Sequence, residues 1–162
     1  MIIVGYPCIG KSTISGGKNI DLDDSDMRFP LRGVSEKPHL IRPEGWEQCY
    51  INVAVSLSLQ GFNVFVSSIP EVVEELKRRG IKFIAIYPSA ELKCRWVERC
   101  AKCYEGDPSE DNEKKLQRVA RCFDEETRML AESTPYQYII ESDKYGLNEL
   151  VKDFMEWQEK EN

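Results

Sequence analysis

The sequence has no long hydrophobic run, and its apolar residues stand in stretches of only a few residues. A membrane-spanning helix needs roughly 20 consecutive apolar residues, so we expect no association with a membrane. The sequence also lacks a basic N-terminal region followed by an apolar segment and a cleavage site, which is the pattern of a secretory signal. We therefore expect a cytoplasmic protein.

Basic charge is scarce as well, because 22 Lys and Arg stand against 28 Asp and Glu, for a formal net charge of -6. Tight binding of long nucleic acid usually needs a basic face, so a nucleic-acid partner stays possible but is disfavoured by the charge. A small anionic ligand in a local basic pocket remains compatible with the negative net charge. Histidine is almost absent, and the single His39, next to Pro38, is predicted to be a loop residue rather than a catalyst.

The arrangement of apolar residues predicts one α/β domain over residues 1–162. β-branched runs alternate with stretches of helical periodicity, which is typical of a five-stranded parallel sheet flanked by helices. The predicted strands are 1–4, 19–22, 62–67, 81–87 and 136–140, and the predicted helices are 44–60, 71–79, 90–103, 110–132 and 147–157. The 6 cysteines are expected to be free thiols, because the chain lacks an export signal.

The clearest motif follows the first predicted strand, where residues 5–13 read GYPCIGKST and fit the pattern G-x-x-x-x-G-K-S/T. After a strand and before a helix, this pattern is a Walker A loop, whose backbone amides surround phosphate oxygens. Lys11 is expected to bridge the β- and γ-phosphates of ATP, and the Ser12 hydroxyl to ligate Mg²⁺. The alternative is a chance glycine turn with a surface lysine. The expected nucleotide-binding residues are Gly5, Tyr6, Pro7, Cys8, Ile9, Gly10, Lys11, Ser12 and Thr13.

The Walker A loop predicts a three-layer P-loop NTPase fold around the parallel sheet. Gly16 and Gly17 follow the loop closely, so the helix after it must be unusually short. Within the loop, the Cys8 thiol lies near a helix N-terminus and Lys11, and we expect its pKa to be lowered.

An acidic segment, defined as residues 21–26, follows the second predicted strand. Ligands of parallel sheets bind at the carboxyl ends of the strands, so these acids are expected to face the phosphates. One carboxylate there would orient the acceptor and take its proton. The alternative for each member is an acidic turn that caps a helix. Since the third predicted strand ends in Ser67 and Ser68 without a Walker B aspartate, Asp21 or Asp23 is expected to serve Mg²⁺ instead.

With these motifs, most of the chain resembles the small P-loop kinases that include nucleoside monophosphate kinases, shikimate kinase and the kinase domain of bacteriophage polynucleotide kinase. The loop is similar to the G-C-P-x-x-G-K-S-T form of polynucleotide kinases, and NIDLDD at 19–24 resembles their strand ending in R-D-D. That match would make Asp23 the general base. The compact size is also similar to that of small phage-encoded kinases.

Residues 91–99 follow the family pattern E-L-x-x-R-x-x-x-R, whose arginines serve a helical lid, here approximately 95–121. The resemblance implies that Arg95 and Arg99 close on the phosphates, with Arg99 at the transferring group. A solvated helix face is the alternative, and Arg118 and Arg121 are further candidates. Cys100 and Cys103 are similar to half of a zinc-binding lid, but a second C-x-x-C pair is missing.

The acceptor pocket is expected in residues 27–43, where basic residues exceed acids in an otherwise acidic chain. Trp46 or Tyr50 would stack on a base there, although aromatic residues at helical spacing are more often core residues. The expected substrate-binding residues are Asp21, Asp24, Ser25, Arg28, Arg32 and Arg42; the catalytic residues are Lys11, Asp23, Arg95 and Arg99, and the metal ligands are Ser12 and Asp23.

The sequence therefore predicts an ATP- and Mg²⁺-dependent kinase that transfers the γ-phosphate to a small-molecule nucleoside or nucleotide, with a nucleoside monophosphate favoured. Two alternatives stay open. The first is a polynucleotide 5'-hydroxyl kinase, favoured by the loop and lid motifs and disfavoured by net charge. The second is a regulatory module that binds ATP without transfer, suggested by the missing Walker B aspartate and the short first helix.

Overall fold

A computed structural model describes residues 1–14, 16–28, 43–106 and 109–142, apart from the side chains of Asp26 and Asp111. The predicted helix 147–157 and the predicted site residues Arg32 and Arg42 lie outside these described residues, as does His39.

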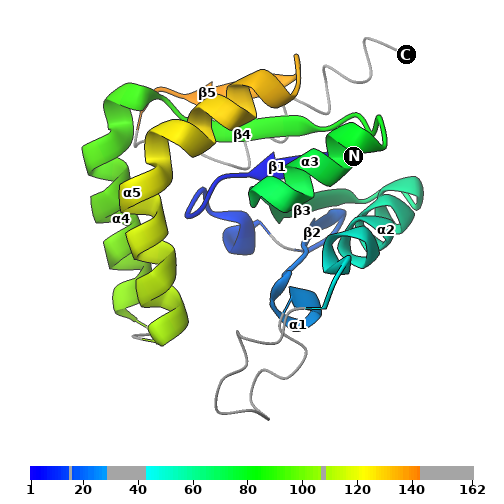
Figure 1. Cartoon of the computed structure of the whole chain (residues 1–162), viewed down its shortest axis with the longest axis horizontal. Coiled ribbons are helices and arrows are strands. Elements are labelled where there is room, and N and C mark those ends of the chain that lie inside the picture. Colours follow the sequence, from blue (N-terminus) through cyan, green and yellow to red (C-terminus); the bar gives the residue numbers. More distant parts are fainter. Residues whose placement is uncertain (15, 29–42, 107–108, 143–162) are drawn as a thin grey trace.

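The chain folds around a five-stranded sheet in which every pair of neighbouring strands is parallel. The strands are β1 (Ile2–Gly5), β2 (Asn19–Asp21), β3 (Asn63–Ser67), β4 (Ile84–Pro88) and β5 (Gln137–Ile140), in the order β2-β3-β1-β4-β5 (Figure 1). The central strands are apolar and almost fully buried, as strands covered on both faces must be. The predicted parallel α/β sheet is confirmed.

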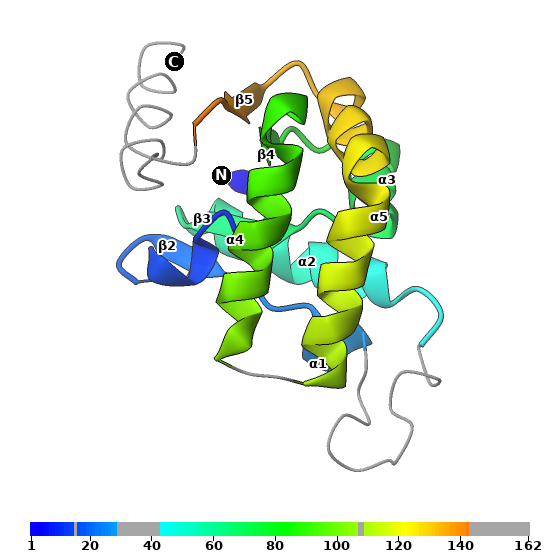
Figure 2. The same ribbon diagram turned by 90° about the vertical axis from the view of Figure 1, so that its left-hand side faces the viewer.

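The longer helices are α2 (Trp46–Leu59), α3 (Pro70–Arg78), α4 (Lys93–Glu105) and α5 (Glu110–Ser133). Helices α2, α3 and α5 lie on the same side of the sheet (Figure 2). Pro70 starts α3 because proline needs no amide partner in a first turn, and the Ser109 hydroxyl caps α5 by accepting from the Asn112 amide at 3.2 Å. Short turns complete the list: η1 (Lys11–Thr13), α1 (Ser25–Arg28) and η3 (Ala90–Leu92).

Helices α4 and α5 pack side by side at the edge of the sheet where β1 and β4 end (Figures 1 and 2). The connection that leaves β1 leads toward β3 and β2, whereas the one that leaves β4 leads to β5. Ligands of open parallel sheets bind at such a reversal of direction, outside the carboxyl ends of the strands. The α4–α5 pair therefore stands beside the expected binding edge.

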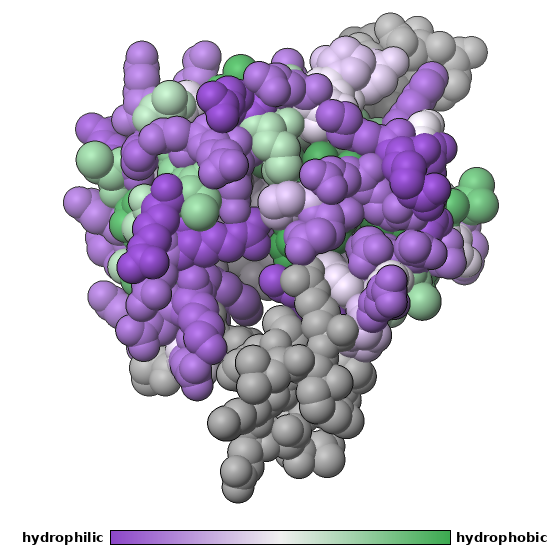
Figure 3. All heavy atoms as spheres, viewed as in Figure 1, coloured by the Kyte–Doolittle hydropathy of each residue, from purple (hydrophilic) through white to green (hydrophobic). Residues whose placement is uncertain are grey.

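The surface seen in Figure 3 is mostly hydrophilic, with apolar residues scattered between polar ones. Leu59 is the most exposed large apolar side chain among the described residues, with 84% of its area exposed. Among the helices that the structure describes, none combines the length and the apolar character needed to cross a membrane.

Candidate functional site

The loop at the end of β1 contains two glycines, Gly5 and Gly10, which allow its sharp turn for different reasons. A Cβ at Gly5 would stand 2.6 Å from Ile9 Cδ1 and 2.9 Å from Lys11 Cδ, so both side chains would have to shift to admit it. Gly10 has a φ of 95°, a conformation that L-residues rarely adopt. Cys8 shares this left-handed character with a φ of 62°, so the loop is bent sharply between the strand and η1.

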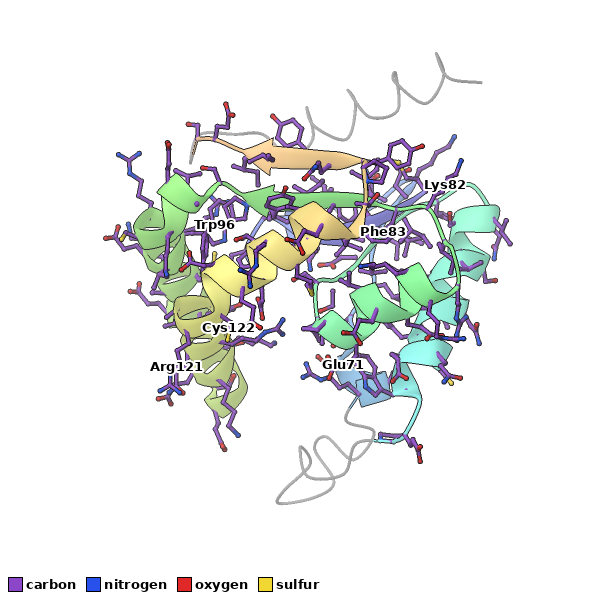
Figure 4. The ribbon with its side chains drawn as sticks, turned by 45° about the horizontal axis from the view of Figure 1, so that its top comes forward. Glu71, Lys82, Phe83, Trp96, Arg121 and Cys122 are labelled. Carbon is purple, nitrogen blue, oxygen red and sulfur yellow. The ribbon has the colours of Figure 1, made fainter. Side chains whose placement is uncertain are left out.

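The loop is anchored by the elements around it. The Tyr6 amide donates to the Ile86 carbonyl of β4 at 3.0 Å. From α4, the Trp96 indole donates to the Pro7 carbonyl at 3.0 Å and Arg99 Nε to the Cys8 carbonyl at 2.9 Å. Trp96 is buried on the inner side of α4 (Figure 4). The two bonds from α4 use carbonyls of the loop, and together with the Tyr6 bond they fix its backbone.

Two of the predicted nucleotide-binding side chains belong to the core. Tyr6 is completely buried and packs edge-on against Phe123 of α5 with 5.6 Å between ring centroids, and Ile9 is 1% exposed. Only the backbone of these two residues can face a ligand. Pro7, Cys8, Gly10, Lys11, Ser12 and Thr13, in contrast, line the cleft described below.

Lys11 turns back under its own loop, where its Nζ donates to the Gly5 carbonyl at 3.3 Å. Burial lowers the pKa of this ammonium group, and the negative charges of Asp21 and Asp24 oppose that shift. Burial in turn raises the pKa of Asp21 and of Asp24. A cation thus sits among carboxylates whose charges it partly neutralises.

Asp23 caps the short helix α1 (Ser25–Arg28). Its Oδ1 accepts from the Ser25 amide at 2.9 Å and from the Ser25 hydroxyl at 2.7 Å. The alternative interpretation of the acidic segment, that its members cap a helix, therefore applies to Asp23. The same bonds hold the exposed Asp23 carboxylate in place at the cleft. One turn later, Arg28 lies 3.7 Å from Asp24 and also faces the Trp46 ring at 5.8 Å.

The ends of β2 and β3 are tied together by a buried tyrosine. The Tyr50 hydroxyl donates to the Leu22 carbonyl at 2.7 Å and accepts from the Ser67 amide at 3.1 Å. Tyr50 is completely buried and Trp46 is 4% exposed, so the hypothesis that either ring stacks on a substrate base is wrong. Helical spacing placed both rings on the inner face of α2, where they pack into the core.

Replacing this hydroxyl tests its structural role. We expect Tyr50→Phe to lower the free energy of unfolding by about 1–3 kcal/mol, because a partly buried amide and a partly buried carbonyl lose their partner. Denaturant unfolding of the two proteins measures the difference. An unchanged unfolding midpoint would mean that the hydroxyl does not hold the ends of β2 and β3.

A single cleft of about 530 Å³ collects the predicted groups at the carboxyl edge of the sheet. The loop forms one wall, the acidic segment a second, and the α4–α5 pair a third. Besides the loop residues, its lining includes Asp21, Asp23, Asp24, Arg28, Ser67, Arg99, Cys103, Tyr104, Lys115 and Arg118. Ser25 is buried beside it as the partner of Asp23.

The two arginines of α4 do not share this cleft. Arg99 lines it, whereas Arg95 lines a neighbouring cavity of about 550 Å³ together with Glu98, Arg99 and Lys102. Arg95 and Arg99 are four residues apart and therefore stand about one turn apart along the axis of α4. Because α4 crosses the edge of the cleft, only one of the two arginines reaches the cleft. Of the two arginines that were expected to close on the phosphates, only Arg99 lies at the cleft.

Arg118 of α5 lines the cleft as well. Its Nε donates to Glu126 Oε1 at 2.5 Å, and Glu126 is only 4% exposed. Burial raises the pKa of Glu126, and the Arg118 charge opposes this shift. From the sequence, Arg118 was only a further candidate, and Glu126 was not predicted at all. The two residues are two helical turns apart, and no short sequence pattern indicates such a pair. Arg121, the other candidate, points outward from α5 (Figure 4).

The donor groups of the cleft suit Mg²⁺. The Ser12 hydroxyl and the carboxylates of Asp21 and Asp23 are oxygen donors, and Mg²⁺ bound with a nucleotide takes one or two carboxylates plus phosphates and water. Among the described residues, no group of three or more His, Cys, Asp and Glu converges as a metal cage, which a site of that kind does not require. All 6 cysteines are free thiols, as predicted.

Comparison of the chain with protein-family models, with curated proteins and with solved structures found no match. The loop, the carboxylates and the arginines that line one cleft are therefore the features that point to a function.

Proposed function

We propose that the chain is a P-loop kinase that transfers the γ-phosphoryl group of ATP to a nucleoside or nucleotide, with a nucleoside monophosphate as the favoured acceptor. The observation that carries the proposal is the cleft itself, which is lined by a G-x-x-x-x-G-K-S/T loop, the acidic segment and three arginines, Arg28, Arg99 and Arg118. Phosphoryl transfer is catalysed mainly by positioning and electrostatic stabilisation, and these groups supply both. The three-layer P-loop NTPase fold, with α4 and α5 as its lid, belongs to this proposal.

The donor side consists of the loop. Its backbone amides would hold the phosphate chain, and Lys11 would stabilise the negative charge between the β- and γ-phosphates. Ser12, with Asp21 or Asp23, would hold Mg²⁺, which when bound neutralises phosphate charge and orients the transferring group. Since Lys11 now bonds to the Gly5 carbonyl, nucleotide binding would exchange that weak contact for phosphate oxygens.

The acceptor side consists of the acidic segment. Asp23 would orient the acceptor and, for a hydroxyl acceptor, take up its proton as the bond to phosphorus forms. Its bonds to Ser25 restrict the carboxylate to one position, which is what a positioned base needs. Arg28 lines the same wall, and its guanidinium group would suit an acceptor phosphate.

A polynucleotide 5'-hydroxyl kinase is the second candidate, favoured by the cavity beside the cleft. Arg95, Arg99 and Lys102 surround that cavity against one acid, Glu98, so further phosphates of a chain would meet positive charge there. An oligonucleotide acceptor would bind with a strong salt dependence, whereas a mononucleotide would not.

A transfer assay tests the proposal. Radiolabelled ATP and Mg²⁺ are incubated with separate pools of nucleosides, nucleoside monophosphates and 5'-hydroxyl oligonucleotides, with the Lys11→Ala protein as the blank. Label in the monophosphate pool is the expected result, and label in the oligonucleotide pool would select the second candidate. ATP binding without label in any pool would contradict a nucleotide kinase and favour a regulatory ATP-binding module.

The positions of the two α4 arginines give a matched comparison. We expect Arg99→Ala to lower kcat by roughly 100-fold or more, because a positioned charge at the transferring group is lost. Arg95→Ala, on the same helix but outside the cleft, should change kcat with a mononucleotide acceptor by only a few-fold. Equal losses in steady-state assays would contradict the assignment of Arg99 alone to the reacting phosphate.

A further inference from the structure

The phosphate loop carries a thiol that faces two more thiols on α4. The Cys8 side chain packs against the core cluster that contains Cys100, and Cys8 lines the cleft together with Cys103 and Tyr104. Cys100 is completely buried, and Cys103 stands one turn later at the cleft. Residues three apart share a helix face, so α4 presents both thiols to the loop. This thiol cluster, Cys8 with Cys100 and Cys103, has no task in the proposed transfer reaction.

The contact between the loop and α4 is built into the fold. Trp96 and Arg99 of α4 bind the carbonyls of Pro7 and Cys8, so the backbone at Cys8 is held on both sides of the residue. The sharp bend at Cys8, with its positive φ, accompanies this anchoring. The thiols are therefore apposed by backbone and side-chain bonds and do not meet by chance motion of a loop.

The three thiols differ in chemistry. Hydrogen bonding with Cys100 is the main cause that lowers the pKa of Cys8 to about 6, with smaller contributions from Tyr104, Cys103 and the Lys11 charge. The same contact raises the pKa of Cys100. Cys8 is therefore the more acidic thiol of the pair, and Cys100 holds its proton more tightly. A partly accessible thiolate beside a second thiol is the arrangement of a peroxide-sensitive cysteine pair.

We propose that the phosphate loop contains an oxidation site, in which hydrogen peroxide converts Cys8 and Cys100 into a disulfide. In the first step, Cys8 Sγ attacks one peroxide oxygen, the O–O bond breaks, and the departing hydroxide takes a proton to leave as water. In the second step, the Cys100 sulfur attacks the sulfur of the Cys8 sulfenic acid, and its hydroxyl leaves as a second water with the Cys100 proton. Two thiols are oxidised and one peroxide is reduced.

The disulfide would act on the proposed ATP site, and this consequence rests on the proposed function. Cys8 lies between the two motif glycines, and a covalent link to α4 would prevent the loop from adapting to phosphates. The disulfide would also fix α4 against the loop, although α4 carries Arg99 for the proposed lid movement. Oxidation should therefore switch off nucleotide binding, and thiol reduction should restore it.

Peptide mapping tests the bond itself without any reference to ATP. The protein is treated with hydrogen peroxide, blocked with N-ethylmaleimide and digested with trypsin without reduction. Trypsin cleaves after Arg99 and Lys102, so Cys100 and Cys103 fall on separate peptides, 100–102 and 103–114. We expect peptide 1–11 linked to 100–102, and the link should vanish on reduction. A link to 103–114, or Cys8 oxidised without any link, would overturn the proposed pair.

Cysteine variants test whether the disulfide switches off ATP binding. Cys100→Ala and Cys100→Ser should bind ATP like the unchanged protein and keep binding after peroxide, whereas Cys103→Ser should stay peroxide-sensitive. We expect peroxide to weaken ATP binding at least tenfold in the unchanged protein and dithiothreitol to reverse it. Binding that survives disulfide formation would overturn the regulatory consequence. If the untreated protein binds no ATP while the linked peptide forms, the proposed function fails and the oxidation site stands.

Discussion

Lys11→Ala is expected to lower phosphoryl transfer by at least about 100-fold, the largest effect among the substitutions considered, because one charge serves two phosphates. The ammonium group lies inside the cleft, 3.3 Å from the Gly5 carbonyl and within the field of Asp21 and Asp24. Without it, those carboxylates would repel the triphosphate. Initial rates of label transfer from ATP, measured with saturating acceptor, give the change.

The matched control for this substitution is Lys18→Ala, since Lys18 is exposed and lies outside the cleft. It should keep its rate within about twofold. Circular dichroism of both variants checks that the fold is retained. If the Lys11→Ala protein folds and still transfers phosphate at a rate within a few-fold of that of the unchanged protein, the loop is not the donor site.

Asp23→Asn is expected to produce the second large effect, a loss of about 100-fold or more in kcat with a smaller change in KM for ATP. Asparagine is as good a helix cap as aspartate, so the hydrogen bonds that Asp23 accepts from Ser25 can persist in the variant. The substitution therefore removes the negative charge and the proton acceptor while it keeps α1 in place. Steady-state kinetics together with thermal unfolding separate the two roles.

The control here is Asp26→Asn, in the same acidic segment, and we expect it to lose much less activity than Asp23→Asn. Asp23→Ala, which removes both cap and charge, should additionally lower the free energy of unfolding by about 1 kcal/mol. Equal kinetic losses at positions 23 and 26 would mean that the segment acts by its summed charge rather than through one positioned carboxylate.

The regular elements were predictable because apolar periodicity is a local property. The strand predicted at 62–67 is β3 (Asn63–Ser67), and the helix predicted at 44–60 is α2 (Trp46–Leu59). The short helix after the loop was predicted from Gly16 and Gly17, and η1 ends at Thr13. Each outcome depends on residues within a few positions of one another.

The meeting of the loop and the acidic segment was also predictable, since parallel strands end at one edge of their sheet. The role of Tyr50 was not, because the same helical spacing suits a core residue and a ring that stacks on a base. Its hydroxyl bonds to Leu22, which directly follows β2, and to Ser67, the last residue of β3. Only the packed arrangement decides between the two interpretations.

The sequence by itself determined the parallel α/β architecture, the phosphate-loop motif and the acids placed after the second strand, since each is written in short stretches. The tertiary structure decided which cations reach the cleft: Arg99 and Arg118 enter it, and Arg95 stays outside. It also decided that Cys8 meets Cys100. The physical reason is that the orientation of α4 and α5 over the loop follows from packing between distant segments, such as Tyr6 against Phe123, which periodicity along the chain does not encode.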